Sequence, residues 1–141
     1  MTLIEAINRA DDLTTNGYSQ SEKIAWLSEL DGRIKESVID KHEGGEAVEW
    51  VGYTDDTPLD TELLIPKPYD SAYIDWIISK IEYANGEIVR YNNYITRFND
   101  VYGQFVSEYH RTHMPKGKKI RYFYILFITK FILICNSRAI L

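Results

Sequence analysis

Residues 74–109 have the sequence IDWIISKIEYANGEIVRYNNYITRFNDVYGQFVSEY, in which apolar or aromatic residues recur at alternating spacings of three and four. Such spacing puts them on one face of an α-helix and is typical of a heptad seam. At about 1.5 Å per residue, these 36 residues would form a rod of roughly 54 Å, longer than the core of a small domain needs. The seam comprises Ile74, Ile77, Ile81, Ala84, Ile88, Tyr91, Ile95, Phe98, Tyr102, Phe105 and Tyr109.

The dipeptide Asn85-Gly86 lies inside this run. We expect a continuous or gently kinked helix, because Ala84 and Ile88 keep the heptad register across the dipeptide. Asn-Gly is also a good helix terminator, and Gly in a helix interior costs about 1 kcal/mol relative to Ala. A helical hairpin that turns at this dipeptide is therefore the alternative.

Two amphipathic helices are expected before residue 45. Each opens with a capping box, in which a hydroxyl group and a carboxylate three residues later bind free amides of the first turn. Apolar residues then recur at helical spacing, and we expect the second helix to continue to the pair Gly44-Gly45. The capping residues are Thr2 with Glu5 and Ser19 with Glu22.

Residues 46–66 have a different composition. Their β-branched and aromatic residues favour extended backbone, while aspartates and prolines interrupt the segment. We expect an extended loop or a short β-hairpin there. The sequence therefore predicts a mainly α fold, a small helical bundle of three to four helices with one long C-terminal helix. Residues 1–115 would form a single helical domain.

The net charge of -5 is unevenly distributed along the chain. All 21 acidic residues and ten of the 16 Lys and Arg lie before position 116, so residues 1–115 carry -11 and residues 116–141 carry +6. Binding DNA through its phosphates needs clustered cations, so we expect no sequence-specific nucleic-acid partner. Cys135 is the only cysteine, and the N-terminus lacks the pattern of a signal peptide, which favours a cytoplasmic protein.

Residues 116–141 form a basic and apolar tail. The segment 120–135, IRYFYILFITKFILIC, is nearly all apolar or aromatic, although Arg121 and Lys130 interrupt it. It is shorter than the roughly 20 residues of a membrane helix, so a membrane is not the expected partner, and an aggregation-prone strand is an alternative. The tail is also consistent with translation past a natural end near Phe123, in which case it is not part of the native fold.

Residues suited to catalysis or metal binding are few. His110 and His113 lie one helical turn apart near Glu108, and His42 precedes Glu43, but two imidazoles without a third ligand are weak evidence for a metal. An acidic cluster in the loop lacks the spacing of a calcium loop. No nucleotide-binding, hydrolase, zinc-protease or CxxC motif occurs. We therefore expect no catalytic residue, no metal and no cofactor, and a protein that is not an enzyme. The acidic cluster comprises Asp55, Asp56, Asp60 and Glu62.

Tyrosine is the most informative residue type, with 11 copies in 141 residues. Its ring is apolar and its hydroxyl tolerates water, which suits a surface that is buried only on assembly. We expect the seam up to Ile88 to form the intramolecular core and the half from Tyr91 to Tyr109 to contact other subunits. Alternatively, these tyrosines complete an intramolecular seam. The candidate interface residues are Trp50, Tyr53, Tyr91, Tyr94, Tyr102 and Tyr109.

Two segments resemble a known group of proteins. Residues 60–76, DTELLIPKPYDSAYIDW, lead through Leu-Ile-Pro-Lys-Pro-Tyr into the long helix, and residues 111–115, RTHMP, follow its end. Both are similar to the head-to-tail connectors of phages and prophages of Gram-positive bacteria, which are also called neck adaptors or head-completion proteins. Residues 81–87, 91–93 and 26–33 and the N-terminal helix share the resemblance, so the likeness covers about residues 1–120. The tail beyond it departs from the group.

The resemblance implies a helical structural protein of the virion that assembles as a ring on the portal. Its partners would be copies of itself and the portal or other neck proteins. It would be found in the host cytoplasm during assembly and then in the virion neck. An acidic body would suit a channel through which DNA slides. The alternative function is a small helical protein-binding or regulatory module of a prophage.

Overall fold

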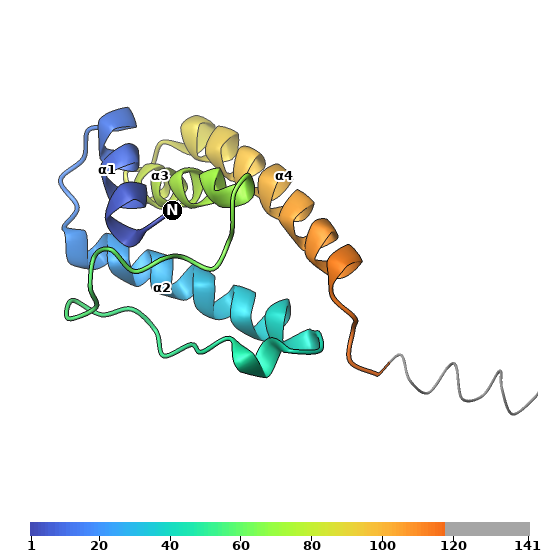
Figure 1. Ribbon diagram of the computed structural model, residues 1–141. Helices are drawn as coiled ribbons and strands as arrows, with labels where there is room; N and C mark the ends of the chain where they lie inside the picture. The colour runs from blue at the N-terminus through green and yellow to red at the C-terminus, as the bar shows by residue number, and fades with distance from the viewer. Residues whose placement is uncertain (118–141) are drawn as a thin grey trace, which may run out of the picture.

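The computed structural model describes residues 1–117, which form four α-helices around one core (Figure 1). The helices are α1 (Leu3–Leu13), α2 (Gln20–Ser37), α3 (Ala72–Ala84) and α4 (Ile88–Thr112). Three short 3-10 helices accompany them within these residues, η1 (Ile39–Lys41), η2 (Gly45–Ala47) and η3 (Tyr69–Ser71). The predicted small helical bundle with a long C-terminal helix is confirmed.

The first two helices begin where their capping boxes predict. The Thr2 hydroxyl accepts a hydrogen bond from Glu5 N at 3.4 Å, and the Thr2 amide donates to the Glu5 carboxylate at 3.0 Å. Ser19 and Glu22 form the same two bonds at 3.2 and 2.9 Å. The predicted end of α2 is wrong, because the α-helix stops at Ser37 and η1 follows it before the glycine pair.

The predicted continuous helix is also wrong, and the helical hairpin is the correct alternative. The Gly86 amide donates to Tyr83 O at 3.1 Å, and the Glu87 amide donates to Glu82 O at 2.9 Å. This pair of bonds is the Schellman motif that ends many helices. Gly86 has φ +77°, a conformation that residues with a Cβ rarely adopt. The glycine therefore ends α3, and α4 packs back along it.

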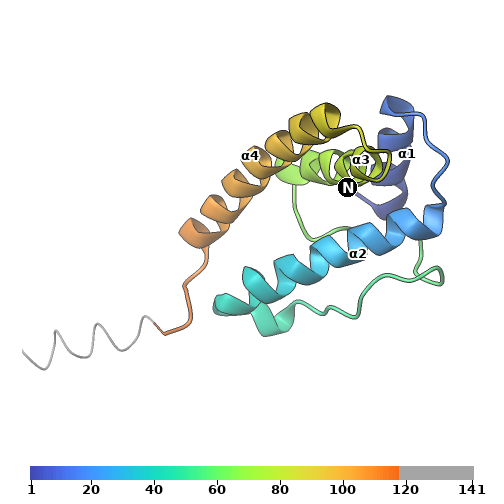
Figure 2. The same cartoon turned by 180° about the vertical axis from the view of Figure 1, so that it is seen from behind.

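α3 is the central helix of the bundle. It packs against α1, α2 and α4, and opposite views place it in the middle of the helices (Figures 1 and 2). Its buried residues are Ala72, Tyr73, Asp75, Trp76, Ile77, Ile78, Ser79, Ile81 and Glu82. Aliphatic residues of the first two helices complete this part of the core, and they include Leu3, Ile7, Ile24, Leu27, Leu30 and Ile34.

α4 contributes much less to the core. Among its 25 residues only Phe98 and Phe105 are buried. Ile88, predicted to lie in the intramolecular core, is 55% exposed, whereas the two phenylalanines come from the half predicted to contact other subunits. The reversal of the chain explains this correction. Ile88 follows the turn directly, while Phe98 lies alongside α3 with its ring centre 5.1 Å from that of Trp76.

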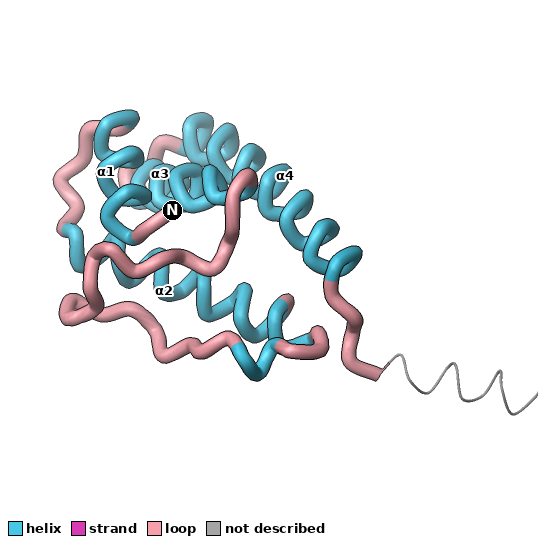
Figure 3. The backbone as a smooth tube through the Cα atoms, in the orientation of Figure 1, coloured by secondary structure: helices cyan, strands magenta, loops and turns pink. Residues whose placement is uncertain are grey.

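Residues 46–66 form an extended loop, and the predicted alternative of a β-hairpin is wrong, because residues 1–117 contain no β-strand (Figure 3). A buried carboxylate holds the loop. Asp31 accepts hydrogen bonds from Tyr53 OH at 2.6 Å, from Leu64 N at 3.2 Å and from Tyr73 OH. Burial raises the pKa of Asp31 against the opposing effect of these donors. Burial and the Asp31 carboxylate also raise the pKa of both tyrosines.

Candidate protein-interaction surface

Exposed apolar side chains flank the turn between α3 and α4. Tyr83 is 65% exposed, Ile88 55% and Val89 74%, and we call these three residues the hairpin-end surface. Tyr91 borders the surface, with its ring centre 5.4 Å from that of Tyr83. Single exposed apolar residues are normal on soluble proteins, but a group of them in one place indicates a contact site.

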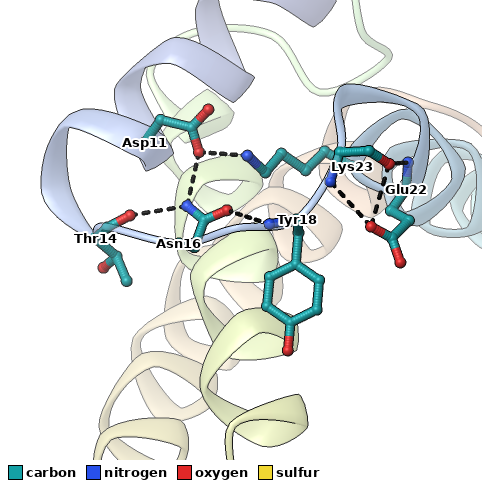
Figure 4. Close-up of polar contacts among 7 residues, drawn as sticks. Asp11, Thr14, Asn16, Tyr18, Glu22 and Lys23 are labelled. Atoms are coloured by element: carbon teal, nitrogen blue, oxygen red, sulfur yellow. Dashed lines mark hydrogen bonds and ion pairs between the residues drawn. The ribbon is translucent and has the colours of Figure 1, made fainter.

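The connection between α1 and α2 reaches the same end of the bundle. Tyr18 OH donates to Asn85 Oδ1 at 3.0 Å. The Asn16 side chain donates to Asp11 Oδ1 at 2.9 Å and accepts from Tyr18 N at 3.2 Å (Figure 4). Asp11 also pairs with Nζ of the buried Lys23 at 2.6 Å. The bond from Tyr18 ties the connection to the hairpin turn, and the other contacts hold the connection to α1 and α2.

A groove of about 290 Å³ lies between α3 and α4 and shares Tyr83 with the hairpin-end surface. Trp76 Nε1 donates to Trp26 O at 2.8 Å, which fixes the indole against α2. Lys80 Nζ lies 4.6 Å from the centre of the Trp76 ring. Trp and Tyr side chains are enriched at protein interfaces. The groove is lined by Trp76, Ser79, Lys80, Tyr83, Tyr91 and Ile95.

Two buried carboxylates of α3 are paired with arginines of α4. Asp75 Oδ1 lies 3.3 Å from Arg97 Nη2, and Glu82 Oε1 lies 3.0 Å from Arg90 Nη2. Burial raises the pKa of Asp75, and the positive charge of Arg97 opposes that shift. Loss of either arginine would leave a buried charge uncompensated, so the pairs favour one position of α4 along α3. The hairpin-end surface is thus presented on a fixed support.

The predicted interface residues Trp50, Tyr53 and Tyr102 make contacts within the chain. The rings of Trp50 and Tyr53 lie 4.8 Å apart on the extended loop, where Tyr53 also binds Asp31. Tyr102 stacks on Phe98 at 5.3 Å. All three predicted residues are half-buried, so each keeps some surface for a partner, and their role between subunits stays a prediction.

The other three predicted interface residues are spread along α4. Tyr91 lines the groove beside the hairpin-end surface. Tyr94 is half-buried, with the Arg97 guanidinium 5.6 Å from its ring centre. Tyr109 lies near the other end of the helix, 5.0 Å from the His42 ring. The structure therefore does not bring the six residues together in one place.

Histidines that lie far apart in the sequence meet at this other end of α4. His42 Nε2 lies 2.9 Å from His110 Nδ1, although 68 positions separate the two residues. His42 is 1% exposed and its Nδ1 donates to Val38 O at 2.6 Å, which leaves its Nε2 to accept a hydrogen bond from His110 Nδ1. Among residues 1–117, no group of three His, Cys, Asp or Glu side chains could hold a metal ion. The pair joins the residue that follows η1 to α4.

Sequence reasoning missed the hairpin-end surface. The continuous-helix interpretation placed Ile88 inside the seam and left Val89 unexplained. A signal was present, because two β-branched residues follow shortly after the helix-ending pair Asn85-Gly86. A hairpin with these residues at its turn has no helix opposite them to cover their side chains.

No protein-family model matches the chain, and neither a curated protein nor a solved structure matches it. Within residues 1–117, no helix is both long and apolar enough to cross a membrane.

Proposed function

We propose that the protein is a structural adaptor that binds copies of itself and a larger assembly, and that it is a head-to-tail connector of a phage neck. The hairpin-end surface carries the proposal. Three exposed apolar side chains on a firmly held turn form the kind of surface that a subunit buries in an oligomer. The similarity of residues 60–76 and 111–115 to neck adaptors supports this choice of assembly.

A closed ring requires a heterologous interface, in which one patch of a subunit meets a different patch of its neighbour. The extended loop offers a second patch on this chain. Val51 is 97% exposed, and Trp50 beside it is only half-buried. We therefore pair the hairpin-end surface of one subunit with the loop around Trp50 of the next.

Native mass spectrometry with the cognate portal tests this function. The wild-type chain should assemble on the portal as several copies. Val89→Asp should weaken that assembly by about tenfold or more, because a charge then enters an apolar contact. Asn99→Asp is the matched control, since it adds the same charge to an exposed position further along α4.

Failure of the wild-type chain to associate with the portal at high concentration would overturn the connector proposal. A complex with one other protein, in which a single copy of the chain binds, would instead favour the prophage binding module. Equal assembly by Val89→Asp and Asn99→Asp would show that the hairpin-end surface is not the contact.

A further inference from the structure

A second groove, of about 280 Å³, lies at the C-terminal end of α4. We call it the C-terminal groove. Its floor includes the buried side chains of Ile39 and Phe105, and its walls include Val48, Leu64 and Tyr109, which are half-buried. The lining is therefore mostly apolar and comes from both the extended loop and α4. An apolar hollow of this kind gains stability when apolar side chains fill it.

The chain leaves the described region beside this groove. His113 lines the groove, and the residues after it run antiparallel to the segment that follows η1 (Figure 1). The Glu43 amide donates to Met114 O at 2.8 Å, and the Lys116 amide donates to Lys41 O at 2.9 Å. These bonds hold residues 114–116 against residues 41–43, directly after His113, which lines the groove.

Residues 116–141 have a charge complementary to that of the segment beside the C-terminal groove. Residues 116–141 contain six Lys and Arg and no acid, whereas Glu43, Glu46 and Glu49 lie on the segment against which the exit is fastened. Lys116 already forms an ion pair with Glu46, and this contact lowers the pKa of Glu46. Lys116, the first cation after residue 115, is thus paired with residues 43–49, which we call the acidic segment. Lys118 and Lys119 follow it closely in the sequence.

Burial of residues 120–135 from water would be energetically favourable. Of these 16 residues, 13 are apolar or aromatic, and exposing such a run is unfavourable. Gly117 lies four residues after His113, which lines the groove, so the two are at most about 14 Å apart, and five further residues of extended chain span a longer distance. The C-terminal groove is therefore within reach, and a short tether gives the segment a high effective concentration there compared with a second molecule.

We propose that residues 120–135 dock in the C-terminal groove of their own chain, with the lysines at 116–119 on the acidic segment. The groove has room for only a few side chains, so it anchors one part of the run. Docking would cover the most hydrophobic segment of the sequence until a partner displaces it. This proposal is independent of the phage-neck assignment.

Limited trypsin digestion of the full chain tests the docking. Arg121 and Lys130 should be cleaved slowly in the wild type, because cleavage follows the population of the undocked state. Val48→Asp puts a charge in the groove wall and should speed cleavage at both sites by about tenfold. Asn99→Asp is the control, because it adds the same charge to an exposed position of α4 outside the groove lining and should leave the cleavage rate unchanged.

A spectroscopic measurement keeps the proposal testable if Val48→Asp disturbs the fold. A nitroxide on Thr129→Cys, in a Cys135→Ser background, should broaden the amide signals of Val48 and Thr112 but not that of Val89. In a mixed sample, chains that carry the nitroxide but no ¹⁵N are added to ¹⁵N-enriched chains without a nitroxide. The amide signals of the ¹⁵N-enriched chains should show no broadening. Broadening in the mixture as strong as in the doubly labelled sample would show a second copy as the occupant and overturn the proposal.

Two further results would also overturn it. One is cleavage at Arg121 and Lys130 in the wild type as fast as in a free peptide of residues 118–135. The other is binding of the full chain to neutral phosphatidylcholine vesicles with the nitroxide buried in lipid, since a membrane would then be the cover. The assembly test with Val89→Asp reports on the other end of α4, so the two proposals can fail separately.

Discussion

α3 and α4 are joined by one short turn and lie side by side, yet they use their residues in opposite ways. Nine of the 13 residues of α3 are buried, against two of the 25 residues of α4. α3 is held on several sides, while α4 is held on one face by aromatic rings and two ion pairs. A helix that is almost entirely buried supplies stability, and its exposed neighbour supplies surface for contacts.

The largest expected effect follows from truncating the same residue type on each helix. Ile77→Ala should lower the free energy of unfolding by about 3–4 kcal/mol, because Ile77 is fully buried and the change leaves a cavity. Ile88→Ala should change it by about 0.5 kcal/mol or less, because Ile88 is 55% exposed. Urea unfolding followed by circular dichroism measures both. Similar losses for the two variants would contradict the division of roles between the helices.

The next largest effect concerns Asp31, whose carboxylate links the extended loop to Tyr73 of α3. Asp31→Ala should cost about 2–3 kcal/mol, because it leaves three buried or half-buried donors without their acceptor. Tyr53→Phe removes only one of these bonds and should cost about 1 kcal/mol. The same unfolding experiment compares them. Equal costs would mean that Asp31 does not serve all three donors.

Local signals in the sequence predicted the helix starts well. A capping box involves two residues in one turn, so Thr2 with Glu5 and Ser19 with Glu22 need no knowledge of the rest of the fold. The mainly α fold follows from such signals and from helical periodicity. The stop of α2 at Ser37 was missed, because the remaining residues before the glycines continue as a 3-10 turn with similar spacing.

The hairpin and the surface it creates depend on information that periodicity does not contain. Heptad register across Asn85-Gly86 is compatible with one helix or with two that share a core, and the positive φ of Gly86 decides between them. The contact between His42 and His110 is likewise invisible in the sequence, because only the fold brings their elements together. The ion pairs that the buried Asp75 and Glu82 form with arginines of α4 cannot be predicted from the sequence for the same reason.

Two glycine substitutions, one in the turn and one inside α4, test the turn that separates the two helices. Gly86→Ala should destabilise the protein by about 1 kcal/mol, because alanine resists φ +77°. Gly103 lies inside α4 with open space around its Cβ position, so Gly103→Ala should stabilise by about 0.5–1 kcal/mol. Thermal unfolding should move the two midpoints in opposite directions. A stabilising Gly86→Ala would indicate that α3 and α4 can form one continuous helix.

The smallest expected effect is a pH dependence at the contact between the two helices. Burial raises the pKa of Asp75 above its ordinary value of 3.8, so the folded protein binds this proton more tightly than the unfolded chain does. The contribution of Asp75 to the free energy of unfolding therefore rises as the pH falls through the raised pKa toward 3.8, and it is lost as the pH rises. Asp75→Asn keeps the shape of the side chain and removes the titrating group.

The measurement is the difference in unfolding free energy between the wild type and Asp75→Asn at several pH values from neutral down to about 4. This difference should move in favour of the wild type as the pH falls. Asp100→Asn, at an exposed position of α4, should show no such trend. If both variants gave curves parallel to that of the wild type, Asp75 would bind its proton equally in the folded and unfolded chains. The contact with α4 would then not be the low-dielectric, paired environment that holds the exposed helix on the buried one.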